Sequence, residues 1–186
     1  MMRPAMASPL TVRATPAELA DQQQVIETKE NIDSFPRLAA IIEAELAAAP
    51  SPLAKWRQFP VEITLRFGWA GGRREFVALT GTVETRIAAL CQRCLQPFEY
   101  PVREDLNLVL ARPDEAGGAA PGYEIWELDD ESLRPADLVE ETLIMAMPLV
   151  ARHEDDQSCQ LKADPVAAER KDLTRPFADL RSQMQD

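Results

Sequence analysis

The sequence of 186 residues has no long apolar run, a single histidine and only three cysteines. No stretch approaches the roughly 20 apolar residues that a helix needs to cross a bilayer, so we expect no membrane span. Residues 1–12 lack a compact apolar core after Arg3, which predicts that there is no secretory signal peptide. An odd number of cysteines without an export signal indicates reduced thiols and a cytoplasmic location.

The chain also lacks the motifs of common enzymes. It has no Gly-rich phosphate loop and no nucleophile elbow, and one histidine leaves little for acid–base catalysis. The carboxylates that most resemble catalytic groups are Asp137, Glu140 and Glu141. Because they follow a predicted helix start, they are better explained by the helix dipole and the solvent. We therefore predict neither an enzyme nor a small-molecule substrate.

Charge is unevenly distributed along the chain, whose formal net charge is −11. Residues 55–103 hold eight basic and four acidic side chains, whereas residues 104–159 hold three basic and fifteen acidic ones. The overall sign argues against a general nucleic-acid binder, since affinity for phosphate comes from clustered Lys and Arg. The asymmetry either serves solubility or marks a surface for a charged partner.

Alternation with a period of two predicts the strands. Val61, Ile63, Leu65 and Phe67 alternate with polar residues, as a strand with one wet face requires. Similar patterns over 76–90 and 97–111 predict two more strands, and short connections favour antiparallel pairing of the three. Gly81 indicates a bulge or a close approach of another backbone, and residues 123–128 are compatible with a further short strand.

Helix signals lie on both sides of these strands. Thr15-Pro16-Ala17-Glu18 is typical of a capping box and predicts a helix to about Glu27. Ser34 is the predicted cap of a second helix that ends before residues 49–52, and Pro135 begins a third. We predict an α+β fold: an antiparallel β-sheet of about residues 60–111, packed with a helix at about 135–147 and preceded by two N-terminal helices. The predicted division is a helical segment 1–52, an α+β domain 53–160 and a weakly structured tail 161–186.

Two of the cysteines form the tetrapeptide Cys91-Gln92-Arg93-Cys94 at a predicted strand-to-strand turn. Together with His153 and Cys159 they offer three sulfurs and one nitrogen, a set that zinc takes in structural sites. Two other interpretations stay open. The thiols could be buried small apolar groups, or they could act in redox chemistry, although the βαβ setting of thioredoxin-type cysteines is absent.

Three arginines near this turn, Arg86, Arg93 and Arg103, are the candidate RNA-binding residues, because guanidinium groups match phosphate oxygens. The alternative is that they are exposed strand and turn residues that balance the acidic segment.

Several landmarks occur in a fixed order. They are Cys91-Gln92-Arg93-Cys94 after an alternating strand, LVEETLIMAMPLV at 138–150, His153 and Cys159, and RPFADL at 175–180. In this order they resemble the bacterial YceD family, the large ribosomal RNA subunit accumulation proteins, over about residues 60–180. The resemblance implies a cytoplasmic factor that supports synthesis, processing or stability of 23S ribosomal RNA, with no assigned reaction.

The partner implied by the resemblance is ribosomal RNA or a large-subunit ribosomal protein. Besides direct contact with RNA, two alternatives remain. The chain could be an acidic module or chaperone that binds a basic ribosomal protein through residues 104–159, or a zinc-stabilised interaction domain without RNA contact. The acidity of that segment favours a basic protein over free RNA.

Overall fold

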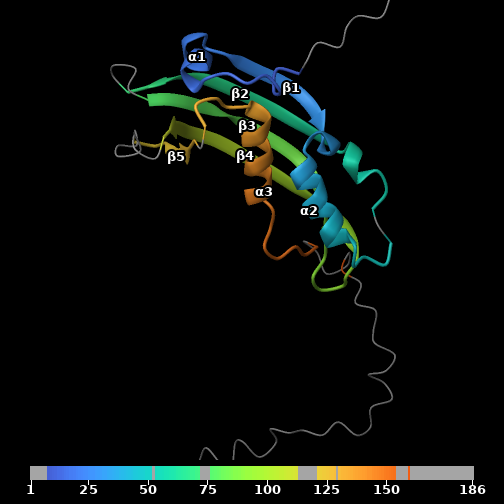
Figure 1. The fold of residues 1–186 in the computed structure, drawn as a ribbon. Helices are drawn as coiled ribbons and strands as arrows, with labels where there is room; N and C mark the ends of the chain where they lie inside the picture. The colour runs from blue at the N-terminus through green and yellow to red at the C-terminus, as the bar shows by residue number, and fades with distance from the viewer. Residues whose placement is uncertain are drawn as a thin grey trace, which may run out of the picture.

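Three long strands form the centre of a five-stranded sheet with the order β1-β2-β3-β4-β5 (Figure 1). The structure is a computed structural model that describes residues 8–51, 53–71, 76–112, 121–128, 130–153 and 159. The strands are β1 (Val25–Asn31), β2 (Pro60–Ala70), β3 (Phe76–Leu90), β4 (Pro97–Ala111) and β5 (Glu124–Glu127). The helices are α1 (Pro16–Asp21), α2 (Pro36–Leu46) and α3 (Pro135–Met145), with short 3-10 turns η1 (Ile32–Ser34) and η2 (Trp56–Gln58).

The alternation in β2 places its apolar residues in the core, as predicted. Val61, Ile63, Leu65 and Phe67 are each at most 4% exposed. On the same face of the sheet lie α2 and α3, whose Leu38, Ile42, Leu46, Leu138, Val139 and Leu143 complete the main apolar cluster. The core is therefore a layer between one face of the sheet and these two helices.

The predicted close approach at Gly81 is confirmed. A Cβ atom added there would lie 2.0 Å from the carbonyl oxygen of Thr64 on β2, far closer than any real contact. Only glycine therefore fits at this position, where β3 lies between Leu65 of β2 and Leu106 of β4.

The predicted fold class is wrong about the sheet and about the segment before it. The sheet is mixed rather than antiparallel, because β5 pairs with β4 in parallel while the other pairs are antiparallel. It also begins earlier: two helices do not precede it as a helical unit, since β1 lies between α1 and α2 and pairs with β2. An α+β arrangement remains, with one helix after the sheet.

The physical reason for this error lies in residues 22–31. The capping box at Thr15 does start α1, but the helix ends at Asp21 and Gln23 takes a left-handed φ of 49°. The following β-branched Val25, Ile26 and Thr28 favour extended backbone. Pairing with β2 then buries Ile26, which a short exposed helix could not do.

Some predictions fall outside the described residues. These include the tail 161–186, with its RPFADL landmark at 175–180. The boundaries proposed at 52 and 160 stay predictions. Within the described part of the chain, no helix is long and apolar enough to cross a membrane.

Candidate metal centre

The cysteine turn connects β3 to β4 and is closed by its own backbone. The N–H of Cys91 donates to the carbonyl of Gln96 at 3.0 Å, and the N–H of Leu95 donates to the carbonyl of Cys91 at 2.8 Å. Leu95 has a φ of 57°, a left-handed conformation that costs a branched residue on the order of 1–3 kcal/mol. This tight turn brings Cys94 back toward Cys91.

The segment after α3 is attached to this turn by two hydrogen bonds from Gln92. Its backbone N–H donates to the carbonyl of Ala151 at 3.0 Å, and its side-chain amide donates to the carbonyl of Leu149 at 3.2 Å. The ring of His153 packs on Phe98 of β4, with 4.5 Å between the centroids. Residues about sixty positions apart in the sequence are thereby brought together.

The four predicted ligands converge. The thiol sulfurs of Cys91, Cys94 and Cys159 and a ring nitrogen of His153 all lie within 4.8 Å of one another. The sulfurs of Cys91 and Cys159 are 3.8 Å apart, and the sulfur of Cys94 lies 3.6 Å from Nδ1 of His153.

These separations can be compared with tetrahedral zinc. With Zn–S of about 2.3 Å and Zn–N of about 2.0–2.1 Å, two sulfurs lie about 3.8 Å apart and a sulfur and a nitrogen about 3.6 Å apart. Two of the separations therefore match a tetrahedral site, and all four ligand atoms lie close enough together to hold one cation. A disulfide between Cys91 and Cys159 would need about 2.05 Å, so these thiols are free in this arrangement.

The electrostatics of the centre favour a cation as well. Burial raises the pKa of the Cys91 thiol, but backbone hydrogen bonds from Cys94, His153 and Arg93 outweigh it and lower the pKa to about 5. Burial, together with hydrogen bonds and repulsion from the two other cysteines, raises the pKa of Cys159 to about 11. Because the two sulfurs lie 3.8 Å apart, ionisation of one thiol opposes ionisation of the other. A cation between them would remove this opposition and allow both to bind as thiolates.

The three candidate arginines do not form one cluster. Arg86 and Arg103 line a shallow groove on the sheet face opposite α2 and α3, together with Glu62 and Glu84, but Arg93 does not line it. Arg86 forms an ion pair with Glu99 at 2.6 Å, and Arg103 with Glu84 at 3.2 Å. Arg93 is exposed in the cysteine turn. Contact of these residues with RNA stays a prediction.

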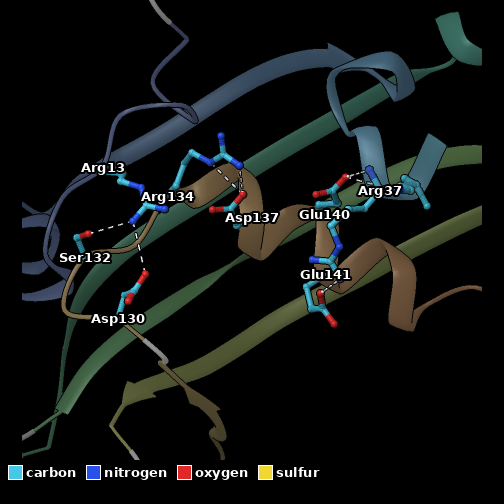
Figure 2. Close-up of polar contacts among 9 residues, drawn as sticks. Arg13, Arg37, Asp130, Ser132, Arg134, Asp137, Glu140 and Glu141 are labelled. Atoms are coloured by element: carbon cyan, nitrogen blue, oxygen red, sulfur yellow. Dashed lines mark hydrogen bonds and ion pairs between the residues drawn. The ribbon is translucent and has the colours of Figure 1, made fainter. Parts of the chain in front are cut away.

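The carboxylates of α3 have protein partners, and one of these was missed from the sequence. Glu140 is 4% exposed and its Oε1 accepts from the backbone N–H groups of Arg37 at 2.6 Å and Leu38 at 3.2 Å (Figure 2). It thus caps the N-terminus of α2 from another helix. The predicted cap Ser34 is wrong: Ser34 ends η1, and the N-cap residue of α2 is Phe35, whose side chain makes no capping hydrogen bond.

The neighbouring carboxylates lie at the surface. Glu141 forms an ion pair with Arg37 at 2.7 Å, and Asp137 forms one with Arg134 (Figure 2). The Glu141 carboxylate raises the pKa of the Arg37 guanidinium, chiefly through their hydrogen bond. The two adjacent glutamates therefore join α3 to the start of α2, rather than serving only the dipole of their own helix. We name this contact the α2–α3 junction.

The fold and the centre define an α+β protein with a three-cysteine, one-histidine cluster between a β-turn and the segment after a core helix. A family model described as large ribosomal RNA subunit accumulation protein YceD matches residues 79–182. The match covers more than half of the chain, and the protein belongs to the YceD family. No solved structure matches it.

Proposed function

We propose that this protein is a non-enzymatic factor that supports the synthesis, processing or stability of 23S ribosomal RNA during large-subunit biogenesis. The family match carries the proposal, because residues 79–182 include the cysteine turn, β4 and α3 together. The family description names accumulation of ribosomal RNA and no reaction. The role belongs in the cytoplasm, where free cysteines of this kind stay reduced.

A single zinc ion is the proposed cofactor, held by Cys91, Cys94, His153 and Cys159. The spacing of the ligand atoms and the opposed thiol pKa values support it. All four positions are taken by protein atoms, which is typical of structural rather than catalytic zinc. The ion would fix the segment after α3 to the cysteine turn, and we assign no reaction to it.

Two kinds of partner are compatible with this role. Direct RNA contact would use Arg86, Arg93 and Arg103. The second candidate is an acidic module for a basic large-subunit protein, and one observation favours it. The carboxylates beside Arg86 and Arg103 already neutralise part of their charge, which weakens their attraction for phosphate.

Depletion of the protein should lower the amount of 23S relative to 16S ribosomal RNA. In-cell crosslinking with sequencing of the bound RNA, together with co-purification of proteins, would then separate the two partners. The test variant changes Arg86, Arg93 and Arg103 to Glu, and a matched control changes the exposed Arg13, Arg57 and Arg66 to Glu.

Loss of specific 23S fragments only in the test variant would support RNA contact. Retention of a basic ribosomal protein in that variant, without RNA, would support the acidic module. Normal levels of 23S ribosomal RNA in cells that lack the protein would contradict both forms of the proposal.

A further inference from the structure

One long edge of the sheet is open in the described part of the chain. β4 has fifteen residues, but β5 has four and pairs only with Leu108–Ala111 (Figure 1). Among the described residues, residues 98–107 have β3 on one side and no strand on the other. Pro101, which has no N–H to donate, lies in this part of β4, as proline in a strand does at an edge. The N–H and C=O groups that face outward here are a template for another strand.

A groove of about 450 Å³ lies beside this edge, between β4, β5 and α3. Its apolar part is formed by Leu106, Leu108, Ile125, Trp126, Met145 and Ala146. Met145 and Ile125 are 64% and 40% exposed, which is unusual for large apolar side chains beside a core. An added strand could therefore bury apolar side chains in the groove while its backbone pairs with β4.

The charge of the groove decides what fits. Four carboxylates line it, from Glu104, Asp105, Glu124 and Glu127, and none of the described residues that line it is basic. Asp105 lies 3.8 Å from Arg103, and the other three form no ion pair with any described residue. Such a groove attracts a cationic segment and repels phosphate. It also repels the same edge of a second copy, which would bring identical carboxylates together.

We propose that the open edge of β4 and this groove bind an extended, basic segment of a partner protein as an added β-strand. Because successive side chains of a strand point to opposite faces, the apolar side chains of the segment would occupy the groove. Its Lys or Arg side chains would lie on the other face of the sheet, where Asp105 and Glu127 are. The inference rests on the proposed role as an acidic module and specifies how that module binds.

The probe is a synthetic ten-residue peptide of alternating Arg and Val, added to the full-length protein as purified. Binding should shift the backbone amide resonances of residues 102–107 and slow their hydrogen exchange. Two further peptides carry N-methyl groups, on the Arg residues in one and on the Val residues in the other. Because alternate N–H groups of a strand face opposite edges, one peptide should bind and the other should not.

The side-chain arm compares two double variants with the same change in charge. Asp105→Lys with Glu127→Lys should weaken peptide binding about tenfold, which corresponds to about 1.4 kcal/mol. Glu27→Lys with Glu43→Lys, on β1 and α2, should change it less than about twofold, because distant exposed charges are screened. An acidic peptide of alternating Glu and Val should not bind.

Several results would overturn the proposal. They are equal effects of the two N-methylated peptides, amide shifts confined to other strands, and equal loss of binding in both double variants. A dimer of the protein alone in which residues 102–107 are already protected would assign the edge to a second copy. Protection of the same amides by a 23S RNA fragment would assign it to nucleic acid. Because this test measures peptide binding in vitro, its outcome is independent of whether loss of the protein lowers 23S ribosomal RNA in cells.

Discussion

The α2–α3 junction and the cysteine centre both attach the region after the sheet to residues far away in the sequence, but they satisfy their polar groups differently. At the junction, one carboxylate oxygen of Glu140 meets two backbone N–H donors that α2 leaves without a cap. At the centre, thiols and an imidazole face one another. The first contact is complete within the chain. The second brings three sulfurs and one nitrogen close enough together to hold one cation.

Metal removal should give the largest loss of stability, because it would release all four ligand residues of the centre at once. Protein purified without added metal should contain one zinc per chain by elemental analysis. If free zinc stands at a thousandfold its dissociation constant, chelation should lower the free energy of unfolding by about 4 kcal/mol. Denaturant titration with and without chelator measures this.

The control for metal removal is Cys94→Ser, which leaves three of the four protein ligands. The free energy of unfolding of this variant should change little when chelator is added. Substoichiometric zinc would show that the centre does not hold one ion per chain. Equal unfolding midpoints of the unchanged protein with and without chelator would show that no metal stabilises the fold.

The centre was more accessible to sequence reasoning than the junction. Cysteine and histidine are rare in this chain, so the four residues stand out as a set in the sequence itself. Their ligand chemistry does not depend on the fold, although only the fold unites pairs about sixty residues apart. The strand parity of β2 was equally clear, since Val61 to Phe67 alternate without interruption.

The junction was hidden because glutamate is common and its partner here is backbone. The sequence places Glu140 near the start of α3, and its own helix dipole was the obvious explanation. In the structure only Asp137 lies in the first turn, and Glu140 points to another helix. β1 was missed for a related reason, because it is set by pairing with β2, which local pattern does not report. The short strand at 123–128 was expected, but its parallel pairing with β4 was not.

Gly81→Ala tests the sheet that supports both regions. Its Cβ would overlap the carbonyl oxygen of Thr64, so β2 and β3 must separate, and we expect a loss of about 3 kcal/mol. Gly68→Ala is the matched control, because a Cβ at Gly68 would meet nothing within 4 Å. Equal unfolding free energies for the two variants would show that the close approach at Gly81 is relaxed at little cost.

Glu140→Ala tests the junction alone. It leaves the N–H groups of Arg37 and Leu38 without their acceptor in a buried site, which should cost about 2–3 kcal/mol. Glu140→Gln keeps an acceptor oxygen and loses the charge, so about 1 kcal/mol is expected. Zinc content should be unchanged in both variants, since the junction and the centre share no residue. Loss of zinc from Glu140→Ala would mean that the two regions are coupled and that the comparison between them fails.

The smallest expected effect belongs to the Arg37–Glu141 ion pair, the exposed part of the same junction. The two side chains are 58% and 36% exposed, so water and salt screen their attraction even at 2.7 Å. A double-mutant cycle of Arg37→Ala and Glu141→Ala should give a coupling that is detectable at low salt. It should vanish near 1 M salt, where the Debye length is about 3 Å. Coupling that persists at high salt would place this pair with Glu140 as a structural contact, and the stability of the junction would then depend on both glutamates rather than on the buried one.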